Sequence, residues 1–324
     1  MTESSGAGSN GERFASIDIG TNSVLMLVVE RAGGGLRAIA ERADITRLGR
    51  GVDSTGHLDE EATARTLVCL RSFADELDRL QVSNRVAVGT SALRDAAGGD
   101  DFLEKAERIL RARPRVLSGK EEAQLSFAGA LSGLNLAKKT TVFDVGGGST
   151  EIISGYVNAE STQIKSAISI NIGAVRLHER YVKHDPPLLE ELKSVQKDVR
   201  EQLPESALYR GVSAVVGVAG TITTLFAISA RMQVYEGEFV HGKSLTRQQI
   251  VDLSNGLSSQ TVAERSRISG LEPRRADVVV AGALIVLEVI DWLGASSITV
   301  SDRGLRWGLV EQCARPGKSE RTDR

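Results

Sequence analysis

One short motif occurs twice in this chain, as IDIGTNS at residues 17–23 and as FDVGGGS at residues 143–149. The copies align without a gap: each has an apolar residue, an aspartate, an apolar residue, a glycine, two further residues and a serine. Each copy lies between two β-rich runs and therefore predicts a hairpin with a glycine in its turn. Two copies of one hairpin predict two related lobes, and lobes that face each other form a cleft, where ligands often bind.

The turn of this hairpin has the chemistry of a phosphate site. Glycine lets the backbone approach a ligand closely, so successive N–H groups can form a nest for an anion, to which the serine hydroxyl adds a donor. The aspartate of each copy, Asp18 or Asp144, suits a hard cation such as Mg²⁺. A lone glycine turn is usually only structural, but two copies with aspartate in register favour phosphate binding. The sequence has neither a GxGxxG that runs into a helix nor a GxxxxGK[ST] phosphate loop.

Strand-like and helix-like segments alternate along the chain, which is typical of an α/β fold. Apolar periodicity predicts helices at residues 59–80, 101–111, 119–133, 175–182, 188–202, 222–231, 247–258 and 274–293, with a last one from about residue 304. A weaker second repeat is formed by residues 88–90 and 219–221, each of which ends a β-rich run before a helix. We therefore expect an α/β protein of two lobes.

The repeat also predicts domain limits. Residues 12–128 and a returning segment at residues 303–318 are expected to form lobe I, and residues 129–302 are expected to form lobe II. The Ser/Gly-rich residues 1–11 are expected to be a disordered lead, and residues 319–324 a charged tail.

Composition and charge exclude several classes of protein. With 41% hydrophobic and 25% charged residues, the 324-residue chain has the composition of a soluble globular protein. A net charge of −2 argues against a nucleic-acid partner. No apolar run is long enough to span a membrane and no signal peptide is recognisable, so we expect a cytoplasmic protein without a membrane partner. Two cysteines and four scattered histidines lack the spacing of metal ligands.

Several stretches of the chain resemble one known family. The paired turns resemble the phosphate loops of the actin, Hsp70 and sugar-kinase superfold, and the detail resembles the exopolyphosphatase/guanosine pentaphosphate phosphatase (Ppx/GppA) family in a short two-domain form. The matching stretches lie between residues 15 and 310, in the family's order: ASIDIGTNSVLMLVV, RLGRGVDSTGHLDEEA, VGTSALRDA, LSGKEEAQLSFAGAL, VFDVGGGSTEI and SDRGLRWGLV. The resemblance implies two ribonuclease-H-like lobes with the active site in the cleft between them.

The resemblance also implies an activity, its cofactors and its partners. It implies hydrolysis of the terminal phosphate of inorganic polyphosphate, of guanosine pentaphosphate (pppGpp), or of both. It implies Mg²⁺ as the cofactor, with Mn²⁺ as an alternative and K⁺ as an additional monovalent cation. A homodimer is also expected. Longer family members have further helical domains at the C-terminus, so any grip on a long polymer would have to come from the two lobes or from a partner subunit.

Individual site residues follow from the matching stretches. Glu122 matches the catalytic glutamate of the family, and Arg94 matches a basic position of its phosphate cleft. The phosphate-binding matches are Gly20, Asn22, Ser23, Gly146, Gly147, Gly148 and Ser149, and the metal-associated acids are Asp144, Glu151 and Asp18. Such a set suits phosphoryl transfer, which needs positioning, charge neutralisation and an oriented nucleophile. For Glu122 and Arg94 taken alone, a surface position on a polar helix is the competing interpretation.

Three questions stay open at this level. A kinase or ATPase of the same superfold would bind a nucleotide near residues 217–221, and a sensor would hold an alarmone without cleaving it. The basic residues of segment 105–120 form either a solvated helix face or a cationic track that leads towards Glu122. If they form a track, replacing Arg108, Arg111 and Arg115 by glutamine raises KM for long polyphosphate far more than for pentaphosphate.

Overall fold

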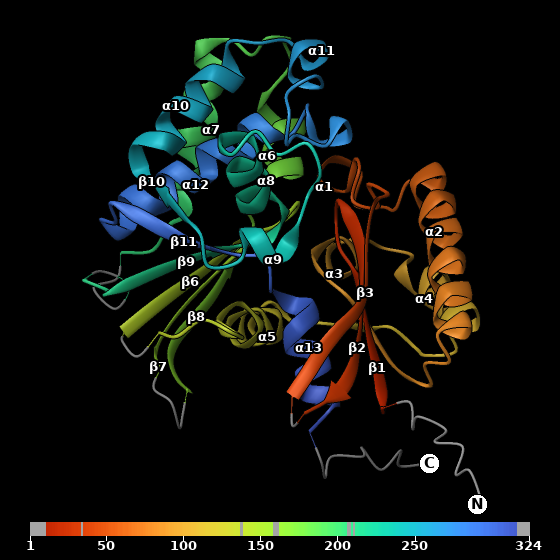
Figure 1. Cartoon of the computed structure of the whole chain (residues 1–324). Coiled ribbons are helices and arrows are strands. Elements are labelled where there is room, and N and C mark those ends of the chain that lie inside the picture. The colour runs from red at the N-terminus through yellow and green to blue at the C-terminus, as the bar shows by residue number, and fades with distance from the viewer. Residues whose placement is uncertain are drawn as a thin grey trace, which may run out of the picture.

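The computed structural model describes residues 11–33, 35–136, 139–157, 162–205, 209 and 211–315. The expected charged tail, and the expected lead apart from its last residue, lie outside the described residues. Within the described part, the chain folds into two α/β lobes that stand side by side (Figure 1). No helix in these ranges is long and apolar enough to cross a membrane.

The first lobe is built on a mixed sheet with the strand order β3-β2-β1-β4-β5. Its strands are β1 (Arg13–Ile19), β2 (Ser23–Ala32), β3 (Gly35–Ile45), β4 (Asn84–Gly89) and β5 (Arg115–Val116). Helices α2 (Glu60–Arg79) and α4 (Gly99–Leu110) cover one face, where Phe73 and Phe102 pack against Ile17. Helix α13 (Leu305–Cys313) covers the opposite face, where Trp307 packs against Phe14. Alternate apolar residues of β1 thus point to opposite faces of the sheet and pack into two separate cores.

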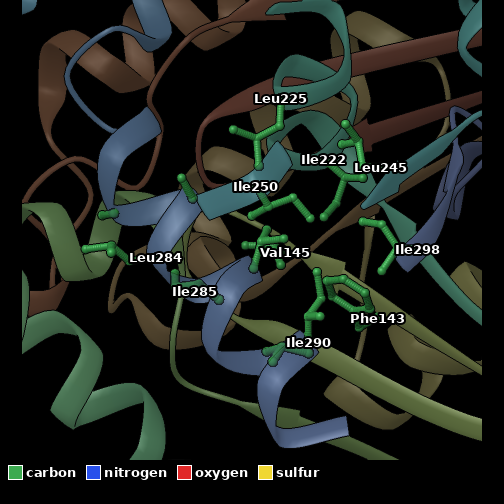
Figure 2. Packing of buried hydrophobic residues seen from close by; sticks show 14 of the residues in the cluster. Phe143, Val145, Ile222, Leu225, Leu245, Ile250, Leu284, Ile285, Ile290 and Ile298 are labelled. Carbon is green, nitrogen blue, oxygen red and sulfur yellow. The ribbon is translucent and has the colours of Figure 1, made fainter. Parts of the chain in front are cut away.

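The second lobe is built on a sheet with the order β10-β11-β9-β6-β7-β8. Its strands are β6 (Lys139–Val145), β7 (Thr150–Val157), β8 (Thr162–Ile170), β9 (Ala214–Val218), β10 (Ser244–Thr246) and β11 (Ser297–Ser301). Its helices are α6 (Ala174–Tyr181), α7 (Leu189–Gln202), α8 (Ala219–Ser229), α9 (Gly237–Val240), α10 (Arg247–Ser258), α11 (Val262–Arg265) and α12 (Val279–Leu293). The main core lies where Phe143 and Val145 meet Ile222 of α8 and Ile285 of α12 (Figure 2).

The two sheets share one topology, which confirms the fold predicted from the repeated motif. The orders β3-β2-β1-β4-β5 and β8-β7-β6-β9-β11 are equivalent, with the first three strands antiparallel and the next two added in parallel. One copy of the motif connects β1 to β2, and the other connects β6 to β7, the equivalent strands of the second sheet. The weaker repeat also occupies equivalent places: residues 88–90 lead from β4 into α3 (Ser91–Asp95), and residues 219–221 follow β9 at the start of α8.

Two helices lie side by side between the sheets, α5 (Gly119–Leu131) and α13 (Figure 1). Glycines allow their contact, because a Cβ at Gly129 would lie 2.0 Å from the carbonyl oxygen of Gly304, and one at Gly308 would lie 2.1 Å from that of Leu125. Helix α5 packs on the second sheet through Ala123 and Phe127, whereas α13 packs on the first. The division of the lobes at residue 128 stays a prediction, and this packing favours a boundary before α5.

Several segments differ from the sequence-based expectation, among them the short helices α3, α9 and α11, which were not expected. The helix expected at residues 274–293 is divided into a 3₁₀ turn, η1 (Pro273–Arg275), and α12, which starts only at Val279. A short helix, α1 (Val52–Thr55), lies before residue 59, where the first helix was expected. The division of the helix at residues 274–293 matters for the site, because η1 places two arginines at the cleft rather than on a helix face.

Candidate active site

A cleft of about 860 Å³ lies between the two lobes and is lined by both copies of the repeated motif. That volume is within the usual range for small-molecule sites, which is roughly 300–1,000 Å³. The predicted site residues that line it are Asp18, Gly20, Asn22, Ser23, Glu122, Asp144, Gly146, Gly147 and Ser149. Three other predicted residues, Arg94, Gly148 and Glu151, lie just behind this lining and contact residues that belong to it.

The two glycine turns have the same internal hydrogen bond. The amide of Gly20 donates to the carbonyl oxygen of Ser23 at 3.0 Å, and the amide of Gly146 donates to that of Ser149 at 3.0 Å. The turns also approach each other across the cleft, because a Cβ at Gly147 would lie 3.2 Å from the amide nitrogen of Asn22. A side chain at this position would make a tight contact with the other lobe, so glycine favours the close approach of the lobes.

Helix α5 brings Glu122 to the cleft. The helix starts with a capping box, in which Ser118 accepts from the amide of Glu121 and the Glu121 carboxylate accepts from the amide of Ser118 at 2.9 Å. Glu121 is thereby held at the exposed start of the helix, while the adjacent Glu122 is buried and lines the cleft. A Cβ at Gly119 would lie 2.5 Å from the Cβ of Ser169, so a glycine lets this helix sit directly on the second sheet.

Arg94 lies beside Glu122 at the C-terminal end of the short helix α3. Its Nη1 donates to Glu122 Oε2 at 3.0 Å and to the carbonyl oxygen of Leu117 at 2.9 Å. The guanidinium thus fixes one oxygen of the glutamate and leaves the other available to the cleft. Arg94 itself is not part of the cleft lining, so its expected phosphate contact stays a prediction.

Four carboxylates gather at this end of the cleft: Asp18, Glu122, Asp144 and Glu151. Burial raises the pKa of Asp18 from 3.8 to about 8, with the charges of Glu122 and Asp144 adding to the effect. Burial likewise raises the pKa of Glu122 to about 7, even though the bond from Arg94 acts in the opposite direction. It also raises the pKa of Asp144 to about 6 and that of Glu151 well above its ordinary value. The four carboxylates can therefore all be ionised near neutral pH only if a positive charge binds beside them.

A divalent cation fits this cluster. Asp18 Oδ1 is buried without any hydrogen-bond partner among the described residues, which is costly unless a ligand satisfies it. Within the described ranges of the chain, no group of three acidic, histidine or cysteine side chains is arranged to hold a metal ion without further ligands. That combination suits Mg²⁺, which usually binds one or two carboxylates and completes its shell with water and substrate phosphates. Asp18 and Asp144 are the cleft-lining side chains that fit this role.

The raised pKa values predict an unusual dependence of stability on pH. Between about pH 4 and about pH 8 the folded chain binds more protons on these carboxylates than the unfolded chain, so the free energy of unfolding of the metal-free protein is expected to fall as pH rises. Mg²⁺ can replace the protons, so it should raise Tm more at about pH 8 than at about pH 5. Thermal melting with Mg²⁺ and with EDTA tests this, and an equal Tm shift at both pH values would contradict it.

Arg275 lines the cleft from η1, although it is not among the site residues that were predicted from the sequence. It donates to the hydroxyl of Ser23 at 3.2 Å, and a Cβ at Gly220 would lie 2.2 Å from its Nη1. No described carboxylate lies within 4.0 Å of this half-buried guanidinium, whereas the neighbouring Arg274 pairs with Glu272 at 3.0 Å. Burial lowers the pKa of Arg275. An arginine in this setting lacks an anion, and a phosphate would supply one.

Other cleft residues were also missed or only noted in passing. Ala219 has φ 75 at the start of α8, a left-handed conformation that is rare for a non-glycine residue and frequent at functional sites. Asp302, which also lines the cleft, accepts from the hydroxyl of Tyr235 and lies 3.6 Å from Arg306. Arg306 in turn reaches Glu41 of the first sheet at 3.0 Å. The sequence offered a signal for Ala219, in the weaker repeat at residues 219–221, and for Asp302 and Arg306, in the matching stretch SDRGLRWGLV.

The basic segment 105–120 lies apart from the cleft. None of its six basic residues belongs to the cleft lining, and α4, which carries two of them, packs beside α2 on the outer face of the first lobe (Figure 1). Its arginines are neutralised locally, in the pairs Arg108–Glu104, Arg111–Asp78, Arg113–Glu107 and Arg115–Glu121. This arrangement favours the solvated-face interpretation over a track that leads to Glu122.

Fold and site together define a class of protein. Two α/β lobes of one topology, with paired glycine turns and a carboxylate cluster in the cleft between them, are the architecture of the actin-like phosphoryl-transfer superfold. The model of the Ppx/GppA phosphatase family matches residues 27–315. The chain belongs to this family, and it is a phosphoanhydride hydrolase.

Individual relatives agree with this assignment. The chain is 35% identical to "Exopolyphosphatase 2" of Mycobacterium tuberculosis strain H37Rv, in an alignment that covers 92% of this chain and 97% of that protein. It is similar to the crystal structure of an exopolyphosphatase-like protein, with TM-score 0.87, 32% identity and coverage of 92% and 98% of the two chains. The Ppx/GppA family member of Aquifex aeolicus is also similar, with TM-score 0.76, 34% identity and coverage of 93% and 97%.

Proposed function

We propose that this enzyme is an exopolyphosphatase, which releases terminal orthophosphate from inorganic polyphosphate by attack of a water molecule. The observation that carries the proposal is the position of Glu122, a buried carboxylate that faces the cleft beside both glycine turns. Polyphosphate as the substrate is supported by the relatives named as exopolyphosphatases. Guanosine pentaphosphate has the same terminal anhydride, and we propose it as a second substrate.

In the proposed reaction, Glu122 takes a proton from the attacking water. The water oxygen bonds to the terminal phosphorus, the bridging P–O bond breaks, and the bridging oxygen remains on the shortened chain. A pKa near 7 places Glu122 close to the optimum for a general base at neutral pH. The bond from Arg94 to Oε2 orients the carboxylate, so that Oε1 is the oxygen free to accept the proton.

The remaining site residues would bind the phosphates. We propose that the amides of both glycine turns, with the hydroxyls of Ser23 and Ser149, hold the terminal phosphate, and that Arg275 contacts its oxygens or those of the next unit. Family members generally depend on a divalent metal, and we propose Mg²⁺, with Mn²⁺ as an alternative, near Asp18, Asp144 and Glu151. Bound there, it would neutralise phosphate charge. A K⁺ ion and a homodimer stay predictions.

Phosphate release in H₂¹⁸O tests the proposed function. With Mg²⁺ present, polyphosphate should yield orthophosphate that carries one ¹⁸O atom per turnover, and gel analysis should show chains that shorten from the end. Pentaphosphate, assayed in parallel, should yield one labelled phosphate and the tetraphosphate. Binding of either compound without any phosphate release would favour a sensor. Transfer of the phosphate to an acceptor other than water would favour a kinase.

Substitutions of arginines distinguish the cleft from the basic segment. Arg275→Gln is expected to raise KM for polyphosphate about 10-fold or more, because it removes a charge-assisted hydrogen bond to an anion. The triple variant Arg108→Gln, Arg111→Gln, Arg115→Gln should leave KM within about twofold on either substrate, because these charges are already paired and lie off the cleft. A large KM increase for long polyphosphate in the triple variant would restore the track hypothesis.

A further inference from the structure

Three polar residues form a row across the second sheet, beneath α5. Asp144 of β6 pairs with Glu151 of β7, and Glu151 pairs with Ser169 of β8. Residues paired directly across neighbouring strands point to the same face of a sheet, with Cβ atoms roughly 4.5–5.5 Å apart. This is the face on which α5 packs, because it also carries Val142 and Ile153, which form a core with that helix. Two acids therefore lie side by side under the helix that bears the proposed base.

Each of these acids receives a hydrogen bond from a serine. The Oγ of Ser126 in α5 donates to Asp144 Oδ2 at 2.9 Å, and the Oγ of Ser169 donates to Glu151 Oε1 at 2.6 Å. Ser126 is fully buried and follows Glu122 by four residues, so both lie on the same face of α5. One helix thus carries the proposed base and a hydroxyl that reaches the neighbouring acid.

We propose that Ser126 is a positioning residue for Asp144. Its hydroxyl occupies Oδ2 and so leaves Oδ1 to face the cleft, where a divalent cation would bind. The inference rests on the proposed function, in which Asp144 is associated with the metal. Hydrogen bonds to the ligands of a metal fix their orientation, and their loss typically weakens metal binding about 10–100-fold. Because Ser126 and Glu122 belong to one rigid helix, the same contact also sets the position of the base relative to the acid.

Binding of Mn²⁺ in the presence of inorganic phosphate, measured by EPR without substrate turnover, tests this inference. Ser126→Ala is expected to weaken Mn²⁺ binding about 10-fold or more. Ser154→Ala is the matched control: this buried serine of β7 is bonded to the hydroxyl of Thr141 and not to a carboxylate, so its loss should leave Mn²⁺ binding unchanged. If Ser126→Ala lowers Tm but binds Mn²⁺ like the wild type, the serine is only structural and the inference is overturned.

A double-mutant cycle with Asp144→Asn separates this inference from the proposed function. If Ser126 acts through Asp144, then Ser126→Ala should weaken Mn²⁺ binding in the wild type and have no further effect in the Asp144→Asn background. Additive losses would overturn the inference, because Ser126 would then act independently of Asp144. Wild-type Mn²⁺ binding by Asp144→Asn alone would instead refute the proposed metal role of this aspartate.

Discussion

Replacing Glu122 by glutamine is expected to lower kcat by about 10²–10⁴-fold, the usual cost of removing a general base. The amide keeps the size of the side chain and can still accept from Arg94, but it cannot take a proton from water. Binding of polyphosphate should persist, because the glycine turns and Arg275 are unchanged. Steady-state kinetics and equilibrium binding of polyphosphate to the variant measure the two effects separately.

The adjacent residue provides the control. Glu121→Gln changes a carboxylate of the same helix, but this side chain caps the start of α5 at the surface and does not line the cleft. It should cost a little stability and leave kcat within about twofold, since a surface change away from the chemistry has small effects. Retention of more than half of the wild-type kcat by Glu122→Gln would exclude Glu122 as the base.

The variant Gly308→Val is expected to destabilise the fold by about 3 kcal/mol or more, at the upper end of what overpacking costs. A Cβ at this position would lie 2.1 Å from the carbonyl oxygen of Leu125, which is backbone and cannot move away alone. The helices α5 and α13 would have to separate, and the cores on their two sheets would loosen with them. Because α5 carries Glu122, kcat should fall as well. Urea denaturation measures the loss of stability.

Gly256→Val is the matched control for this substitution. Gly256 also lies inside a helix, α10, but a Cβ there meets nothing within 4 Å. Valine has a better helix propensity than glycine, so this variant should be neutral or slightly more stable. Equal stability of Gly308→Val and Gly256→Val would contradict this prediction, because it would mean that the two lobes do not depend on the close contact of α5 and α13.

The features that the sequence revealed are those encoded over short distances. The glycine turns at residues 20–23 and 146–149 follow from strand–turn–strand patterns of a few residues each, and their duplication predicted two lobes of one topology. The helix that carries Glu122 was predicted at residues 119–133 from its apolar positions, and in the structure a capping box at Ser118 marks its start. Such signals depend on local backbone geometry, which a short stretch of sequence determines almost alone.

Tertiary structure decided which of these residues meet. Arg275 contacts Ser23 from 252 residues away, and Ser126 reaches Asp144 in the next strand, but no periodicity in the sequence indicates either contact. The apolar pattern even suggested one helix from residue 274 onwards, whereas η1 ends at Arg275 and leaves that side chain beside Gly220. For the basic segment 105–120, the sequence showed the positive charges but did not indicate which acidic residues pair with them. Contacts between distant segments depend on how the sheets and helices pack against one another. The pattern of side chains along one segment does not indicate which other segment it will contact.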